Sequence, residues 1–280
     1  MALSIHTNYS ALVTQSSLNR TNSTLALNQQ RLGTGLRINS ASDDAAGLQI
    51  ATRLNAQTRG MGVANRNTGD AISLLQTAEG AFNEITSIVQ RMKDLATQSA
   101  NDTNSAKDRT SIQAEFDQLA KEVENIFGNT TYAGDNLFSD TGKFSKAVNF
   151  QIGATAAETL TLDVSADMAT LKKTLTEELS KLTLEDNAKS TASITALDST
   201  LDAIGSMRAS FGANINRLNH TANNLANMKD NTDLARGRIL DADIATESAN
   251  MTKNTMLMQS GISMLKQAGQ MPSLVMSLLG

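Results

Sequence analysis

Apolar residues recur at alternating steps of four and three along most of this chain, a spacing that puts them on one face of an α-helix. The clearest run is Leu75, Ala78, Phe82, Ile85, Val89, Met92 and Ala96. Pro272 is the one proline in 280 residues, so the commonest helix breaker is missing from nearly the whole chain. We therefore predict one long helix from Ala45 to about Ala100.

Two more long helices are predicted. The polar turn Asn101–Ser105 precedes a helix whose apolar positions are Ile112, Phe116, Leu119, Val123 and Ile126. Because the turn is short, that helix should pack antiparallel on its predecessor and end near Gly128. Heptads return from about Ser193, with Arg208 where an apolar residue is expected. Arg208 either extends to the rim or pairs with a carboxylate of a neighbouring helix.

Between residues 130 and 165 the apolar period changes to two, which is typical of strands. The alternating residues are Phe144, Val148, Phe150 and Ile152, followed by Leu160, Leu162 and Val164. We predict a β-hairpin here, with a smaller hairpin or loop at 130–138. Residues 165–190 are weakly patterned and should form a short helix and an exposed connector. The predicted fold class is mainly α, a long antiparallel helix bundle or coiled coil with a small β-hairpin region.

The two ends of the chain share an unusual composition. Residues 1–36 carry a narrow apolar stripe, Ala11, Leu18, Leu25 and Leu32, between polar uncharged residues. Such a stripe could form one arm of an intramolecular coiled coil, or it could become ordered only against other copies of the chain. Residues 254–280 are rich in Met, Leu, Ile and Ser, with more apolar residues than one seam needs. Both termini are expected to lie together.

A joint between two helices is predicted within Arg31–Ile50, RLGTGLRINSASDDAAGLQI. Gly33 and Gly35 interrupt the apolar spacing, because glycine weakens a helix and admits backbone angles that other residues avoid. Asp43 and Asp44 belong to a cluster of residue types that cap helix N-termini and suit the positive end of the helix dipole. One helix should end here and another begin.

Catalysis, cofactors, metals and nucleic acid find no support in the residues. The two histidines, His6 and His220, lie far apart in the sequence, and no zinc-protease or nucleotide-binding motif occurs. With no cysteine there is no disulfide or thiolate metal site. A net charge of −4 disfavours nucleic acid. No apolar run is long enough to cross a membrane, so membrane insertion is not expected, and no cleavable signal peptide is recognisable.

Four segments resemble bacterial flagellin. They are Arg31–Ile50, the start MALSIHTN, the stretch Ala235–Glu247 (ARGRILDADIATE) and the close Pro272–Leu279 (PSLVMSLL). The similarity covers about the first 135 and the last 90 residues. The resemblance implies a non-enzymatic structural subunit that is exported unfolded by the flagellar type III apparatus and polymerises into the extracellular filament used for motility.

The resemblance also implies a domain organisation. Residues 1–35 and 244–280 would form a discontinuous inner-core coiled coil that is disordered in the free subunit, and residues 36–243 the outer core. Only about 65 residues separate the two family-like regions, so the variable outer domains of many flagellins should be missing. The inner core would be assembled through Leu18, Leu25, Leu32, Ile262 and Leu265. The joint of Gly33, Gly35, Asp43 and Asp44 would separate the layers.

Partners follow from the same resemblance. The first is a homopolymer of other flagellin subunits, and a flagellar export chaperone, the filament cap and hook-associated proteins are further partners. Two segments, Gln90–Gln98 and Ser111–Glu115, look like those that engage the flagellin-sensing Toll-like receptor of hosts. By position, Gln90, Arg91, Leu95 and Glu115 would contact that receptor, although the primary role of this face is expected to be packing between subunits.

Two alternatives remain open at this stage. A hook–filament junction protein shares terminal helices of this kind and would differ in copy number. A secreted amphipathic helical protein could instead use the Met-rich C-terminus on membranes, although basic residues beside that segment are few.

Overall fold

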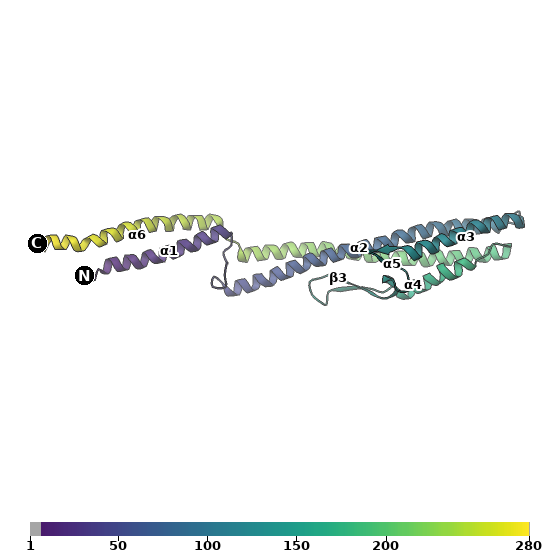
Figure 1. The fold of residues 1–280 in the computed structure, drawn as a ribbon, viewed down its shortest axis with the longest axis horizontal. Coiled ribbons are helices and arrows are strands. Elements are labelled where there is room, and N and C mark those ends of the chain that lie inside the picture. Colours follow the sequence, from purple (N-terminus) through teal and green to yellow (C-terminus); the bar gives the residue numbers. More distant parts are fainter. Residues whose placement is uncertain (1–6, 280) are drawn as a thin grey trace. The chain divides into compact units, whose positions relative to one another are not determined.

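The computed structural model describes residues 7–279, and side chains for residues 7–270. The chain is mainly helical (Figure 1), which confirms the predicted fold class. Its helices are α1 (Tyr9–Thr34), α2 (Ala45–Ser99), α3 (Ala106–Asn129), α4 (Ser165–Lys172), α5 (Asn187–Leu240) and α6 (Ile244–Leu279). The strands are β1 (Thr131–Tyr132), β2 (Asp135–Asn136), β3 (Val148–Gln151) and β4 (Thr159–Leu162). Three short helical segments lie between these elements: the 3-10 helices η1 (Lys143–Ser145) and η3 (Leu179–Lys181) and the π-helix η2 (Lys173–Glu178).

The chain divides into two compact units. Residues 1–58 and 231–280 form one, called here the terminal unit, and residues 59–230 form the other, the bundle unit. The helices α2 and α5 contribute residues to both. The predicted boundary at residues 35 and 244 separates layers of the assembled filament, not compact units of one chain, and it stays a prediction.

In the terminal unit, α1 and α6 lie side by side (Figure 1). The N-terminal end of α1 is capped by Asn8, whose Oδ1 accepts from the backbone N–H of Ala11 at 3.0 Å. The amide of Asn8 also donates to the carbonyl of Ala268 at 2.7 Å. In this structure the N-terminal stripe packs against α6 of the same chain, which is the intramolecular coiled-coil arm of the two interpretations.

In the bundle unit, α2, α3 and α5 run alongside one another (Figure 1). Arg91 of α2 meets Glu115 of α3, and Ser99 meets Arg109. As residue numbers increase along α2, the numbers of the residues they contact on α3 decrease. The helices α2 and α3 are therefore antiparallel, as the short turn predicts. Lys93–Asp198 and Glu79–Arg208 ion pairs show the same relation between α2 and α5. Arg208 therefore takes the second expected role, pairing with a neighbouring carboxylate.

The centre of the bundle unit is a cluster of phenylalanines. Phe138 has ring centroids 4.9 Å from Phe82, 5.0 Å from Phe127 and 6.2 Å from Phe144, and Phe211 closes the cluster against Phe82 and Phe144. All five rings are buried. A chain with 3% aromatic residues thus concentrates most of its rings where α2, α3, α5 and the segment after α3 meet, and large buried rings contribute strongly to core stability.

Two antiparallel hairpins follow α3. Thr131 pairs with Asn136 in the first, and Val148 with Leu162 in the second. The turn of the second hairpin packs on α2, because a Cβ placed on Gly60 would lie 2.8 Å from the Cβ of Ala154. Glycine here permits the close approach of the hairpin to α2, because it has no side chain in the way. Phe144, expected in a strand, lies in the 3-10 helix η1.

The connector is the main error of the sequence prediction. Instead of an exposed tip, residues 165–184 place a row of apolar side chains in the core: Met168, Leu171, Leu175, Leu179 and Leu184. Steps of four residues drift around an α-helix, which hides the pattern from a three-four search. The wider π-helical turn η2 offsets that drift and keeps the row facing inward.

Candidate assembly site

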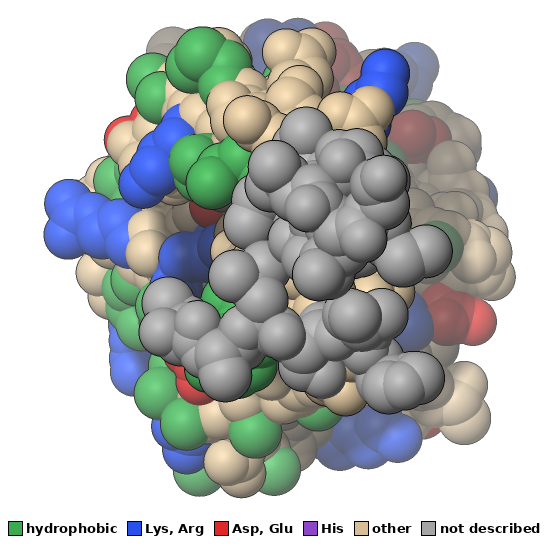
Figure 2. Space-filling view, turned by 90° about the vertical axis from the view of Figure 1, so that its left-hand side faces the viewer, with side chains coloured by type: hydrophobic (Ala, Val, Ile, Leu, Met, Phe, Trp, Pro, Cys, Tyr) green, Lys and Arg blue, Asp and Glu red, His purple; other side chains and the backbone are tan. Residues whose placement is uncertain are grey.

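Exposed hydrophobic side chains gather in the terminal unit. Those on its helices are Tyr9, Leu12, Val13, Ile50, Leu234, Ile244, Met256, Leu257, Ile262 and Met264. In the described part of the bundle unit, Val63 and Met228 are the large hydrophobics that are exposed. The end-on view shows hydrophobic side chains on the visible surface beside Lys and Arg side chains (Figure 2). A monomer that leaves so much apolar surface in contact with water has a face suited to a protein partner.

The α1–α6 interface covers only part of the predicted assembly residues. Leu25 is buried at 7% exposure, and Leu18, Leu32 and Leu265 are half-buried. Leu18 packs so near Gly261 that a Cβ there would lie 3.1 Å from Leu18 Cδ1. Ile262 is 53% exposed and therefore adds little to the pair within one chain.

A polar network crosses the same interface. Arg31 Nη1 of α1 donates to Glu247 Oε1 of α6 at 3.0 Å, and the side chains are 24% and 11% exposed. Asn28 is 4% exposed. With its amide turned to satisfy its neighbours, Asn28 donates to Glu247 Oε2 and accepts from Asn254. Buried polar groups in a helix pair fix its register, because any shift leaves them unpaired.

Sequence reasoning missed this network. Asn28 and Arg31 are three residues apart, one turn of the same helix face, and they flank the apolar stripe. A search for polar residues at seam positions would have found them. The matching Glu247 would still have been one of several acids near the second end.

The joint is built from the residues that the sequence singled out, in unequal roles. Gly33 lies inside α1, whereas Gly35 ends it in the left-handed conformation at φ 72°, its N–H donating to Arg31 O at 2.8 Å. Asp44 precedes α2, and its Oδ1 accepts from the backbone N–H of Gly47 at 2.8 Å, as an N-terminal cap does.

Asp43 closes the loop rather than capping α2. Its Oδ2 accepts from the backbone N–H groups of Ser40 at 2.8 Å and Asn39 at 3.0 Å. These bonds favour the ionised carboxylate and lower the pKa of Asp43 below its ordinary value, with the Ser40 N–H the largest cause. These bonds hold Asp43 against Asn39 and Ser40 and close the turn before α2.

The returning chain passes the same joint. A single β-bridge joins Leu36 to Asp241, and the Arg37 N–H donates to Leu240 O at 2.6 Å. Asp243 then starts α6, accepting from Thr246 Oγ1 and from the Ala245 and Thr246 N–H groups. The Thr246 hydroxyl is the main cause of the lowered pKa of Asp243. Asp243 therefore caps the N-terminus of α6.

The candidate receptor residues divide by exposure. Gln90, Arg91 and Glu115 are exposed, and Glu115 Oε1 accepts from Arg91 Nη2 at 2.7 Å and from Arg91 Nε at 3.1 Å. Leu95 is 1% exposed and belongs to the core. The prediction that Leu95 is a contact residue is corrected on this point, because a side chain inside the bundle cannot reach a partner without unpacking it.

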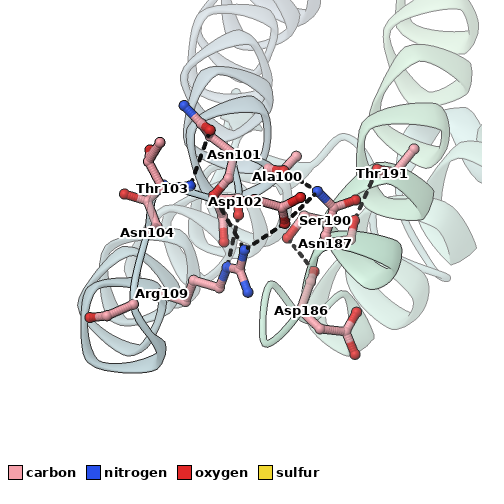
Figure 3. Close-up of polar contacts among 12 residues, drawn as sticks. Ala100, Asn101, Asp102, Thr103, Asn104, Arg109, Asp186, Asn187, Ser190 and Thr191 are labelled. Carbon is pink, nitrogen blue, oxygen red and sulfur yellow. Dashed lines mark hydrogen bonds and ion pairs between the residues drawn. The ribbon is translucent and has the colours of Figure 1, made fainter.

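A polar cluster holds the end of α2 where it turns into α3 (Figure 3). Arg109 donates to the carbonyls of Ser99 and Asn101 and lies 3.6 Å from Asp102 Oδ1, while Asn187 of α5 donates to Ala100 O and Asp102 Oδ1. Helix C-termini leave carbonyls without partners, and these side chains supply them. The cluster therefore ties the polar turn to α3 and to the start of α5.

Neither a metal site nor a membrane span occurs among the described residues. Within the described residues, no group of three or more His, Cys, Asp and Glu could hold a metal ion. None of the described helices combines the length and apolar character needed to span a membrane. The closing segment PSLVMSLL, which carries part of the resemblance, has side chains outside the described set.

Comparisons with known proteins match both ends of the chain. The model of the bacterial flagellin N-terminal helical region matches residues 5–143, and that of the C-terminal helical region matches residues 194–279. A flagellin of Halalkalibacterium halodurans is 41% identical over 251 residues, covering 89% of this chain and 90% of the relative.

Two other comparisons concern length and fold. Flagellin A of Vibrio anguillarum is 35% identical over 382 aligned positions that cover both chains completely, so it carries residues that this 280-residue chain lacks. A solved structure described as a flagellar hook-associated protein from Vibrio parahaemolyticus covers 71% of this chain and 100% of that chain at 18% identity, with a TM-score of 0.60. That likeness concerns the fold alone. Matched along most of its length by proteins named as flagellins, the chain belongs to the bacterial flagellin family.

Proposed function

We propose that this flagellin builds its filament in two layers, with residues 1–35 and 244–280 as the inner core and residues 36–243 as the outer core. As a flagellin, the chain is a structural subunit of the extracellular flagellar filament and polymerises with other flagellin subunits. The layers and the residues that hold them together are the proposed part. In this proposal the terminal helices gain their full stability only when neighbouring copies cover them.

One observation carries the proposal: the exposed apolar side chains of α1 and α6. Leu12 is 54% exposed on α1, and Ile262 and Met264 are 53% and 63% exposed on α6. Burial of apolar surface contributes about 25 cal/mol per Å². Among the described side chains of α1 and α6, Leu25 is the apolar one that is buried. The pair therefore gains little free energy from apolar burial within one chain, and most of that free energy would be gained on assembly.

Substitution of Ile262 tests the proposal. Ile262→Asp should leave the unfolding of the bundle unit unchanged, since the side chain is exposed, and should abolish filament growth from seeds. Ile262→Leu keeps the apolar surface and should grow filaments, and Ile262→Asn separates lost apolar contact from added charge. Growth is measured by sedimentation and electron microscopy. Normal filaments from Ile262→Asp would refute the inner-core role.

The joint has a proposed mechanical role. Gly33, Gly35, Asp43 and Asp44 would connect the inner layer, fixed by its neighbours, to an outer layer that adjusts its lateral contacts. The β-bridge at Leu36 and the bonds to Asp43 support a joint of defined shape rather than a loose tether. Alanine at Gly33 and Gly35 should restrict the filament waveform, and an unchanged waveform in electron micrographs would count against this role.

Further partners are proposed on the same surfaces. The exposed apolar residues of α6, among them Met256 and Leu257, are suited to an export chaperone before assembly and to the filament cap and hook-associated proteins afterwards. The measurement is hydrogen exchange of the purified chain with and without the chaperone. Protection should centre on α6, and protection confined to the bundle unit would contradict the assignment.

A host Toll-like receptor is proposed to engage the exposed face of Gln90, Arg91 and Glu115, with Leu95 supporting α2 from the core. The ion pair between Arg91 and Glu115 presents both groups in one place. Arg91→Ala should weaken receptor binding, while Lys107→Ala, an exposed cation elsewhere on α3, should not. Equal binding by both variants in a direct assay would exclude the site.

A further inference from the structure

Two facing helix stretches at one end of the bundle unit contain no acidic residues. On α2, residues 59–69 contain Arg59 and Arg66 and no carboxylate, and on α5, residues 212–229 contain Arg217 and Lys229 and no carboxylate. The two stretches pack together through Met61, Ala64 and Leu225. The rest of the unit carries an excess of Asp and Glu over Lys and Arg. These two stretches are therefore basic, whereas the rest of the unit is acidic.

Arg59, Val63 and Arg66 form what we call the basic stripe. Steps of four and three residues put them on one face of α2. Both arginines are exposed, and Val63 is one of the few large hydrophobics exposed in this unit, at 47%. Among the described residues, neither arginine has a carboxylate within 4 Å.

Two carboxylates near the basic stripe, those of Glu158 and Asp70, form no ion pair with its arginines. The hairpin turn on Gly60 brings in Glu158, whose Oε2 accepts from the Thr155 N–H at 2.8 Å. That N–H is the main cause of the lowered pKa of Glu158. Asp70 lies one turn beyond Arg66, but no ion pair joins them. An apolar side chain between two unpaired arginines is thus left facing solvent.

Glu115, Leu119 and Glu122 on α3 have the same spacing with the opposite charge, and we call them the acidic stripe. Both glutamates are exposed, and Leu119 is half-buried against the core. Glu122 has no ion pair within the described residues, whereas Glu115 pairs with Arg91. Seven residues of helix span about 10.5 Å in either stripe, so their charges match in separation.

The two stripes cannot meet within one copy. Arg91 lies beside Glu115, so the acidic stripe lies along the later part of α2. From the centre of the basic stripe to that level is on the order of 40 Å of helix at 1.5 Å per residue. A second copy, parallel to the first and displaced along the helices, brings the stripes together.

We propose that the basic stripe of one copy docks on the acidic stripe of a second copy. This inference rests on the proposed function, since it describes a contact between subunits of the filament. In parallel copies α2 of one faces α3 of the next in opposite directions, so Arg59 pairs with Glu122, Arg66 with Glu115 and Val63 with Leu119. Complementary charges of this kind fix register and exclude wrong alignments more than they add affinity.

A charge swap tests the pairing. Arg59→Glu should raise the concentration needed for seeded filament growth about tenfold at low salt, because a like-charge contact repeats at every subunit. Glu122→Arg should do the same from the other side. The double variant Arg59→Glu/Glu122→Arg restores opposite charges and should return growth to within about twofold of the parent.

The matched control is Arg59→Glu/Glu124→Arg. It has the same net charge as the swap, but Glu124 lies on a different face of α3 from Glu122, two residues away. This control should grow as poorly as Arg59→Glu alone. Equal rescue by both double variants, or parental growth of Arg59→Glu, would overturn the inference.

Folding and the proposed function are checked in the same experiment. All these side chains are exposed, so urea unfolding of each variant should match the parent, and Glu122→Arg replaces Arg59→Glu should the latter unfold. Failure of the parent chain to polymerise would overturn the proposed function itself. Growth of the parent together with indifference to the charge at 59 and 122 would overturn the stripe contact alone.

Discussion

The terminal unit and the bundle unit are built from similar long helices and bury them in opposite ways. In the bundle unit, phenylalanine, leucine and methionine side chains meet at a core that is almost inaccessible to water. In the terminal unit, Leu25, Ile38 and Ala51 are the buried apolar residues among those described. Helical periodicity is thus compatible with either outcome, and stability depends on how much apolar surface finds a partner.

The polar groups differ in the same direction. At the terminal interface the amide of Asn28 and the carboxylate of Glu247 are buried, and Arg31 pairs with Glu247. Such groups contribute specificity more than stability. A subunit whose ends must align with many copies benefits from register there, whereas the bundle benefits from a core that holds its outer surface rigid.

The largest effect is expected inside the bundle unit. Phe138 is 1% exposed and contacts three other rings. Phe138→Ala should lower the free energy of unfolding by about 3–5 kcal/mol, through lost burial and the cavity left behind. Urea unfolding followed by circular dichroism measures it. Ile262→Ala is the control from the terminal unit and should change the same transition little, and equal losses in both variants would erase the contrast between the units.

An intermediate effect is expected at the terminal polar network. Glu247→Ala leaves Arg31 and Asn28 without their partner and should weaken the α1–α6 pair by about 1–2 kcal/mol, between the costs of exposed and buried ion pairs. Hydrogen exchange should rise in α1 and stay unchanged in α3. The control is Glu84→Ala, which removes an exposed carboxylate of the bundle. Unchanged exchange in α1 would show that the network does not hold the pair.

The smallest effect separates two glycines of the joint. Gly35 has φ 72°, and nothing lies within 4 Å of a Cβ placed there or on Gly33. Gly35→Ala should destabilise the end of α1 by about 1 kcal/mol because an L-residue is strained in that conformation. Gly33→Ala should stabilise the helix by about 0.5–1 kcal/mol. Exchange rates of the last α1 amides should move in opposite directions, and a common direction would mean that Gly35 is not held in its left-handed state.

Some features of the bundle unit could be predicted from the sequence and others could not. The apolar run from Leu75 to Ala96 predicted the buried face of α2, and the short turn after α2 predicted that α3 is antiparallel to it. The connector leucines were missed because their four-residue steps fit a π-helical turn better than a heptad. Leu95 was taken for a receptor contact because the resemblance concerned sequence position, and a position in a motif does not show how deeply a side chain is buried.

The candidate site divides in the same manner. Gly35 and Asp44 could be chosen from residue type alone, because left-handed backbone and free N–H groups favour those residues. The partnership of Asn28 with Glu247 could not, since it joins residues more than two hundred positions apart. The basic stripe carries a spacing visible in the sequence, and only the packing of α3 beside the later part of α2 separates it from the acidic stripe in one copy.

The sequence by itself determined that this chain is helical, that its ends are poor in charge, and that it belongs with the flagellins. Those properties follow from local periodicity, composition and motifs, which a linear chain carries unfolded. The tertiary structure decided which helix faces meet, which leucines are buried, and which charges stay unpaired. These depend on distances between residues remote in sequence, and such distances exist only once the chain has folded.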